Sequence, residues 1–291
     1  MASVASVQPQ ATIRHRVRVD WRSAILLAVL GGGALVMFAP FALMFAAALQ
    51  PGTDFYDLPP AFVPIHFTLD NVRAAVTGPA PMPAFFINSL KIAIAVTIGQ
   101  LATCSLAGYA FAQLRFPGRN LLFALLLSAL MIPVQVTIIP TFVLMRALGL
   151  IDNHLSLILP NLSSALGIFL MRQFFLGLPR ELMDAARIDG AGHLRTFWAI
   201  ALPLAGPPVA ALTVIAFLGS WNSLFAPLVF LSTYDHFTLP LGIVQSQDPL
   251  SFVGPAVPLA AAMLAVVPML LVFVVAQRWI VAGLARSGIK G

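Results

Sequence analysis

Long apolar stretches separated by short polar segments make up most of this sequence. Six of them can each cross a bilayer, and none contains a carboxylate; they cover residues 23–49, 85–113, 121–145, 155–174, 204–231 and 255–280. About 20 helical residues span a hydrocarbon layer of about 30 Å. The pattern predicts an all-α membrane protein with six transmembrane helices, kinked where prolines such as Pro133, Pro140, Pro227 and Pro268 interrupt them.

Composition supports this interpretation. The 291 residues are 60% hydrophobic and 9% charged, against roughly 45–50% and 25% in soluble domains. The net charge of +6 comes from bases scattered beside apolar runs, which argues for a lipid bilayer and against nucleic acid as a partner. Cys104 is the single cysteine and lies in an apolar stretch, so we expect no disulfide within the chain and no thiolate metal site.

The first apolar stretch follows Arg14, Arg16, Arg18 and Arg22 and so resembles a secretory signal. It is too long for the roughly 7–15-residue core of such a signal, and we interpret it as the first transmembrane helix. The domain boundaries that follow are a tail at 1–22, the first helix at 23–49, an outer loop at 50–84, a five-helix core at 85–281 and a tail at 282–291.

The distribution of basic residues predicts the orientation. An N-terminus in the cytoplasm leaves only Arg73 and Arg146 clearly outside, with Lys91 ambiguous near the end of a span. The bases then inside are Arg14, Arg16, Arg18, Arg22, Arg115, Arg119, Arg172, Arg180, Arg187, Arg195, Arg278, Arg286 and Lys290. By the positive-inside rule both termini are cytoplasmic.

A charged insert at 177–203 separates two apolar stretches and faces the cytoplasm in this topology. Pro179 suits the first turn of a helix, Glu181 and Asp184 favour its N-terminal end, and Gly190 can end it in the left-handed conformation. We predict a helix over residues 180–189 and a second after Gly192 that yields at Leu202 and Pro203. The insert also has five large apolar residues, Leu182, Met183, Ile188, Phe197 and Trp198. They can pack on the helix bundle or dock to another protein, and the sequence leaves both uses open.

The insert also resembles a family signature. Asp184-Ala-Ala186, Gly190 and Ile200-Ala-Leu-Pro203 have the spacing of the loop of bacterial ABC importer permeases, with Asp184 in place of the family's Glu. Further segments resemble the maltose-type and glycerol-phosphate-type carbohydrate permeases: Tyr109-Ala-Phe-Ala-Gln-Leu-Arg-Phe-Pro-Gly-Arg119, Met131-Ile-Pro-Val-Gln135, Trp221-Asn-Ser-Leu-Phe-Ala-Pro227 and Thr238-Leu-Pro-Leu-Gly242.

The resemblance implies a type I ABC importer permease fold in the bacterial inner membrane, with a cytoplasmic coupling helix that docks to an ATPase. The coupling residues it implies are Glu181, Asp184, Ala185, Ala186, Asp189, Gly190 and Gly192. The implied partners are a second permease subunit, two ATP-binding subunits and an extracytoplasmic solute-binding protein that meets the loop at 232–254. The tail at 287–291 would extend between the ATPases.

The chain has no Gly-x-x-x-x-Gly-Lys-Ser/Thr sequence, since its lysines are Lys91 and Lys290. We therefore expect a non-catalytic subunit without a cofactor or metal of its own, and ATP and Mg²⁺ on partner subunits. The histidines His15, His66, His154, His193 and His236 are dispersed in the sequence and predict no metal or catalytic pair.

Neutral polar residues within the spans match the hydrogen-bonding needs of sugars and polyols. The candidates for the substrate pathway are Gln135, Asn161, Asn222 and Ser223, although each can instead bridge two helices. Two alternatives to an ABC permease stay open, an ion-driven secondary carrier and a purely structural membrane subunit. The carrier is disfavoured because no ionisable group lies near the middle of a span.

Overall fold

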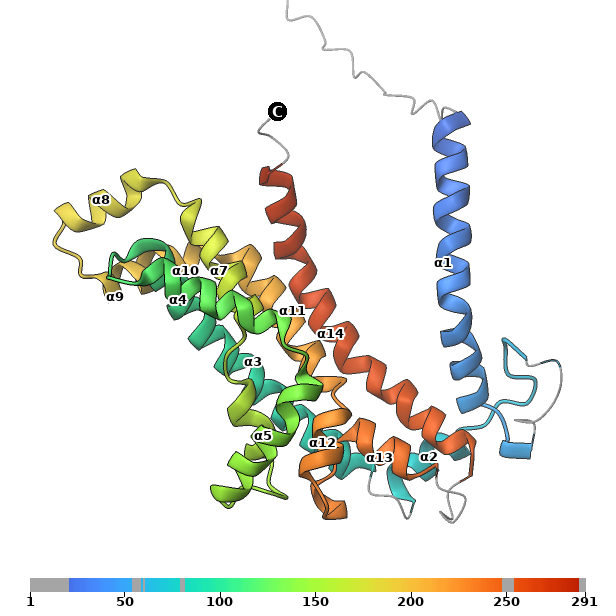
Figure 1. Cartoon of the computed structure of the whole chain (residues 1–291). Coiled ribbons are helices and arrows are strands. Elements are labelled where there is room, and N and C mark those ends of the chain that lie inside the picture. Colours follow the sequence, from blue (N-terminus) through green and yellow to red (C-terminus); the bar gives the residue numbers. More distant parts are fainter. Residues whose placement is uncertain (1–20, 54–58, 60, 79–81, 248–253, 288–291) are drawn as a thin grey trace, which may run out of the picture.

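The computed structural model describes residues 21–53, 59, 61–78, 82–247 and 254–287, with side chains up to Trp279. The regular elements in these ranges are all helical, as predicted (Figure 1). They are α1 (Trp21–Ala48), α2 (Asp70–Thr77), α3 (Met82–Gln113), α4 (Arg119–Ser128), η2 (Ala129–Met131), α5 (Val134–Ala147), α6 (Leu155–Ile158), η3 (Leu159–Asn161), α7 (Ala165–Leu176), α8 (Arg180–Ile188), α9 (His193–Thr196), η4 (Phe197–Ala201), α10 (Leu202–Leu204), α11 (Gly206–Trp221), α12 (Phe225–Phe230), η5 (Tyr234–His236), α13 (Leu239–Gln245) and α14 (Ala256–Ser287).

Four helical segments in the described ranges are long and apolar enough to cross a membrane: Trp21–Ala48, Met82–Gln113, Leu155–Leu176 and Ala256–Trp279. Two further pairs are bent, Arg119–Met131 with Val134–Ala147 by 104° and His193–Leu204 with Gly206–Trp221 by 81°. The number of spans is therefore four to six, depending on whether each bent pair crosses as one unit.

The expected third span is not one continuous helix. Ile132, between the two halves, has φ −92° and ψ 116°, the extended conformation that a following proline imposes. Pro133 also lacks the N–H that would continue the helix. Pro140, by contrast, lies inside α5, and Pro268 lies inside α14.

The expected fifth span also ends early. The helix stops at Trp221 instead of running to residue 231, and α12 begins only at Phe225. Residues 222–224 between them are not helical. This break brings Ser223 to the wall of a cavity described below.

The long helix α3 is central to the bundle, and its main neighbours are α7 and α11. Close approach to α7 depends on glycine, because a Cβ built on Gly108 would lie 2.6 Å from Cβ of Met171 and 2.9 Å from the backbone N of Arg172. Two apolar clusters follow α3. One contains Phe85, Trp221 and Leu239, and the other contains Tyr109, Phe175 and Phe197.

The molecule has two distinct ends (Figure 1). The start of α1, the insert helix α8 and the last turns of α14 lie at one end, which we call the insert end. The helices α2 and α13 lie at the other, which we call the loop end. Over most of its length α1 stands apart from the bundle (Figure 1), and its buried residues Ala46 and Ala48 are near the loop end.

Candidate functional site

The first insert helix forms as the sequence predicts. Glu181 lies in the first turn of α8 and Arg187 in the last, which suits the helix dipole. Gly190 has φ +73°, and its N–H donates to the Arg187 carbonyl at 3.0 Å while the Ala191 N–H donates to the Ala186 carbonyl at 2.9 Å. These bonds satisfy the free carbonyls at the helix end, so the predicted stop at Gly190 is confirmed.

The predicted break before the fifth span is present, with a bend of 81°, but it lies two residues after Pro203, at Ala205. The chain stays helical to Leu204 and turns at Ala205, where φ is −80° and ψ is 21°. A π-helical turn, Phe197–Ala201, directly precedes Pro203. Its wider winding accommodates a proline ring that would clash with an ordinary helical turn.

The structure divides the apolar residues of the insert between the two uses that the sequence leaves open. Met183 and Phe197 are buried in the chain's own bundle, at 5% and 1% exposed. Ile188, at 86% exposed, lies free on the surface with Leu182, Leu194 and Trp198. The insert therefore has one face attached to the bundle and one face without a partner among the residues that the structure describes.

Six of the seven predicted coupling residues, Glu181, Asp184, Ala185, Asp189, Gly190 and Gly192, are exposed. Ala186 is the exception, because it is 4% exposed and packs toward the bundle. Asp184 accepts a hydrogen bond from Arg187 one turn later, with Oδ1 and Nη1 3.1 Å apart and both side chains more than half exposed. Such an exposed pair adds little stability.

Aromatic contacts attach the insert to α3. The Tyr109 ring lies 5.3 Å from the Phe197 ring and 5.7 Å from the Phe175 ring, measured between centroids. One turn on, the Gln113 amide Nε2 donates to the Phe175 carbonyl at 2.6 Å. Tyr109 on α3 thus contacts the insert at Phe197, and α3 also contacts α7 at Phe175.

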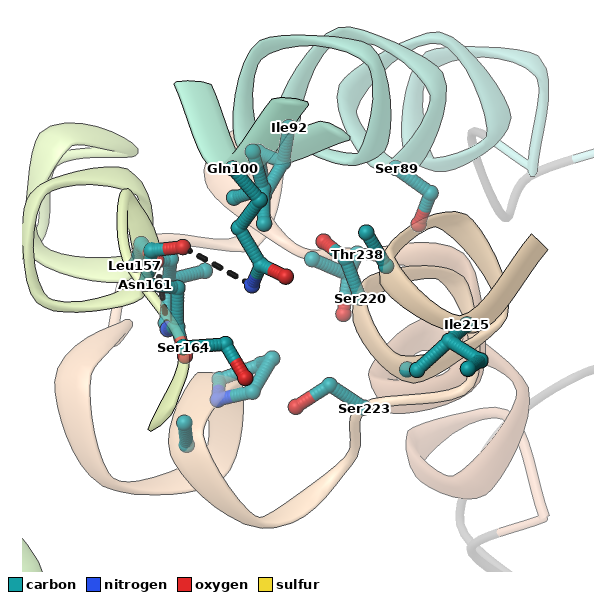
Figure 2. A pocket seen from close by; sticks show the side chains of 15 residues that line it. Ser89, Ile92, Gln100, Leu157, Asn161, Ser164, Ile215, Ser220, Ser223 and Thr238 are labelled. Atoms are coloured by element: carbon teal, nitrogen blue, oxygen red, sulfur yellow. Dashed lines mark hydrogen bonds between the residues drawn. The ribbon is translucent and has the colours of Figure 1, made fainter. Parts of the chain in front are cut away.

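A polar cavity of about 260 Å³ lies farther along α3. Ser89, Ile92, Val96 and Gln100 of α3 line it, and their spacing of three and four residues places them on one helix face. The opposite walls come from residues after α5 and from α11 to Thr238 (Figure 2). The lining set has no ionisable side chain: Ser89, Ile92, Val96, Gln100, Leu157, Asn161, Ser164, Ile215, Ala216, Gly219, Ser220, Ser223, Ala226, Pro227 and Thr238.

Two of the four predicted pathway residues, Asn161 and Ser223, line this cavity. Gln135 and Asn222 do not belong to its lining, and both are exposed. Sequence reasoning missed Ser89, Gln100 and Thr238. The spacing of Ser89 and Gln100 on one face of α3 could have revealed these two residues. Thr238 follows a loop, and hydrophobic periodicity does not predict where a loop lies.

A second polar cluster at the loop end joins residues that are distant in sequence. The His154 and His236 rings lie 5.7 Å apart, and His236 Nδ1 is 3.4 Å from Oδ1 of Asp152. The two histidines, which are far apart in the sequence, are thus neighbours in the fold. No group of three metal-ligating side chains suited to an ion occurs within the described ranges.

Burial raises the pKa of Asp152, but hydrogen bonds from Thr233 and Ser232, with the His236 ring close by, outweigh it and leave the pKa well below its ordinary value. The carboxylate therefore stays ionised. It links the loop after α5 to the segment after α12, which leads to Thr238 at the cavity.

Membrane-length helices, a neutral polar cavity and an insert attached to the cavity-lining helix define a polytopic membrane protein of the transport class. Residues 104–286 match the family described as the binding-protein-dependent transport system inner membrane component. The chain belongs to this family. It is thus a multi-pass inner-membrane permease component of an ABC transport system, as the resemblance implies, and the secondary-carrier alternative finds no support.

Several known proteins are similar to it. The arabinooligosaccharides transport system permease protein AraQ of Halalkalibacterium halodurans is 37% identical over 260 residues, 89% of this chain and 93% of the relative. The sn-glycerol-3-phosphate transport system permease protein UgpE of Yersinia enterocolitica is 37% identical over 284 residues, 94% and 99% of the two chains.

One solved structure has the same fold. It is a bacterial ABC transporter involved in the import of the acidic polysaccharide alginate, and one of its chains superposes with a TM-score of 0.79 at 24% identity. The match covers 90% of this chain and 97% of that one. It confirms the ABC importer permease fold that the sequence predicts.

Proposed function

We propose that this chain is one of two permease subunits of an ATP-driven importer for a carbohydrate or related polyol. Substrate crosses by alternating access, and the insert is the coupling helix through which a separate ATPase drives the change. The coupling residues are Glu181, Asp184, Ala185, Ala186, Asp189, Gly190 and Gly192. A solute-binding protein delivers substrate at the loop end.

One observation carries this proposal: α3 connects the insert with the cavity. Tyr109 contacts Phe197 of the insert segment, and Gln100, two to three turns away on the same helix, lines the cavity. Because α3 is one helix of 32 residues without an internal proline, it moves as a rigid element. Pulling on the insert therefore changes the shape of the cavity.

The exposed face of α8 supports a docking partner. An isolated surface helix gains nothing by exposing Ile188 and Leu182 to water. The small Ala185 beside them allows close approach of another chain, and Asp184 offers acceptors for basic or backbone donors. An ATPase with a matching cleft satisfies both features.

The charges at the two ends support a cytoplasmic insert. The insert end carries Arg180, Arg187, Arg195 and Arg278, whereas the bases toward the loop end are Arg73 in α2 and Arg146 in α5. This distribution follows the positive-inside rule. Residues 1–20, from the tail that the positive-inside rule places in the cytoplasm, and residues 288–291, from the tail that the resemblance places between the ATPases, lie outside the described residues.

The energy source follows from what the sequence lacks. Without a phosphate-binding Gly-Lys-Ser/Thr loop, this chain depends on ATP and Mg²⁺ held by partner subunits. A similar permease serves arabino-oligosaccharides and another serves sn-glycerol 3-phosphate, which supports a substrate rich in hydroxyl groups.

Reconstitution tests the proposal. The chain is assembled in proteoliposomes with the candidate partner permease, ATPase and solute-binding protein, and ATP turnover and uptake are measured with a panel of sugars and polyols. We expect at least one compound to raise ATP turnover and to accumulate only when ATP is present. Uptake that follows a proton or sodium gradient without ATP would refute the proposal.

A further inference from the structure

The polar cavity has the composition of a sugar site within this subunit. Its polar groups are hydroxyls and amides from Ser89, Gln100, Asn161, Ser164, Ser220, Ser223 and Thr238. Figure 2 shows the side chains of Gln100, Ser164, Ser223 and Thr238 turned toward the same space from different elements. Such converging neutral donors and acceptors suit a ligand that has hydroxyl groups on several sides.

Part of this polar set is already engaged. The Gln100 amide Nε2 donates to the Asn161 carbonyl at 3.0 Å, and Ser164 Oγ accepts from the Gly167 N–H at 3.3 Å. The first bond fixes the Gln100 side chain, and Figure 2 shows its amide oxygen on the side of Ser220 and Thr238. Gln100 therefore presents an oriented acceptor to the cavity.

Thr238 supplies the independent observation. Its side chain lines the cavity, the residue is 4% exposed, and Oγ1 has no hydrogen-bond partner among the described residues. A buried hydroxyl without a partner costs free energy, so most native structures avoid one. A hydroxyl group of a bound ligand would satisfy it.

The absence of charge in the lining selects the ligand. A phosphate or carboxylate placed there would lose its hydration without gaining a basic partner, which is strongly unfavourable. A neutral hydroxyl exchanges hydrogen bonds with water for hydrogen bonds with Thr238 and Gln100 at little cost. The volume of about 260 Å³ lies just below the roughly 300–1,000 Å³ of pockets for drug-sized ligands, which suits one ring-sized unit.

We propose that this cavity is a substrate subsite for one uncharged sugar or polyol unit, with Thr238 and Gln100 as its specificity-determining residues. This subsite rests on the proposed function. It narrows the range of substrates, because it disfavours phosphorylated and uronic compounds. The chain then itself contacts the substrate and is more than a support for the partner permease.

Thr238→Val is the decisive variant, since it keeps the shape of the side chain and removes only the hydroxyl. If Thr238 had only a structural role, Thr238→Val should not weaken substrate uptake, because the hydroxyl makes no hydrogen bond within the described residues. Thr238→Ser keeps the hydroxyl. The matched control is Thr97→Val, which alters a buried threonine on α3 outside the cavity lining, whose hydroxyl donates to the Ala93 carbonyl at 2.6 Å.

The measurement is ATP-dependent uptake by the complete transporter in proteoliposomes. The neutral probes are arabinose, arabinotriose, maltose and glycerol, and the charged probes are sn-glycerol 3-phosphate and glucuronate. We expect wild-type uptake of a neutral probe. Thr238→Val should raise its KM by about 3- to 10-fold, as expected for one uncharged hydrogen bond, with unchanged maximal rate and no decrease in Tm. Thr238→Ser and Thr97→Val should keep the wild-type KM.

Three results would decide against the subsite. A neutral probe taken up with the same KM by Thr238→Val and the wild type would overturn it and leave the importer function intact. Uptake of the charged probes alone would refute the preference of the subsite for uncharged ligands and would leave ATP-driven import intact. If the assembled wild type takes up none of the probes, the proposed carbohydrate function itself fails, and the subsite with it.

Discussion

The carboxylate of Asp152 accepts a hydrogen bond from the backbone N–H of Thr233 at 2.9 Å, although the two residues are 81 positions apart. The same oxygen accepts from the Ser232 N–H at 2.9 Å. Asp152 also has a left-handed backbone, with φ +58°. One side chain thus anchors the segment that leads to Thr238 and the cavity.

Asp152→Asn should loosen this anchor. Asparagine tolerates the left-handed backbone as well as aspartate does, so the variant changes mainly the charge. Hydrogen bonds to a charged group contribute about 1.5–3 kcal/mol, and part of this should be lost as a decrease in Tm of the detergent-solubilised protein.

The pH dependence of that decrease is also predicted. Because the folded pKa of Asp152 is lowered, its stabilisation is complete above the ordinary aspartate value of about 3.9 and is lost as the pH falls through the lower folded value. The difference in Tm between wild type and Asp152→Asn should shrink as the pH falls below about 4. A difference that is unchanged at about pH 2 would contradict this.

Gly190→Val should disrupt the insert. No atom lies within 4 Å of a Cβ built on Gly190, but its φ of +73° disfavours any side chain, at about 1–2 kcal/mol and more for a β-branched residue. Uptake should be abolished while the permease and the ATPase still copurify. Gly177→Ala is the control, because Gly177 begins the insert outside the coupling set, has φ −83°, and a Cβ there would lie at an ordinary 3.4 Å from the Phe174 carbonyl oxygen. Normal uptake by Gly190→Val would count against the coupling role of the insert.

Asp184→Lys should weaken association with the ATPase, because it places a positive charge where a partner is proposed to donate hydrogen bonds. The change also removes the pair with Arg187. Arg187→Gln breaks the same pair while keeping the carboxylate and so separates the two effects. We expect low copurification of the ATPase with Asp184→Lys and a near-normal yield with Arg187→Gln. Equal yields from both would show that Asp184 acts only within its helix.

Gly108→Ala should destabilise the bundle. The added methyl group would meet the backbone N of Arg172 at 2.9 Å, so α3 and α7 must separate, and overpacking of this kind costs about 1–3 kcal/mol. Gly219→Ala on α11 is the comparison, since no atom lies within 4 Å of its Cβ position. Gly108→Ala should have a clearly lower Tm than Gly219→Ala. Similar values for the two would mean that α3 and α7 pack less tightly than the structure indicates.

Local patterns predicted part of this molecule correctly. The apolar stretches gave the helical class, and Gly190 marked the helix end because only a residue without Cβ adopts its backbone at little cost. The break before Pro133 follows from the same local reasoning. These features depend on neighbours within a few residues.

Features set by distant neighbours were missed. The helix through Pro203 depends on a π-helical turn, and the meeting of His154 with His236 depends on how two loops fold back onto α3. Thr238 reaches the cavity because Ser89 Oγ accepts from the Leu239 N–H at 2.8 Å, across 150 positions. Which face of the insert is buried likewise depends on where Tyr109 of α3 lies in the folded protein. The hydrophobic periodicity of the insert alone does not predict that position.

We expect the exposed face of α8 to lie in the cytoplasm and to be covered by an ATPase subunit. Ile188→Cys tests it directly, because the single native cysteine, Cys104, is buried. Labelling with a membrane-impermeant maleimide is compared in inside-out and right-side-out vesicles, with and without the bound ATPase. A cytoplasmic, ATPase-covered α8 predicts labelling only in inside-out vesicles and protection when the ATPase is bound. Labelling in right-side-out vesicles, or no protection by the ATPase, would contradict it.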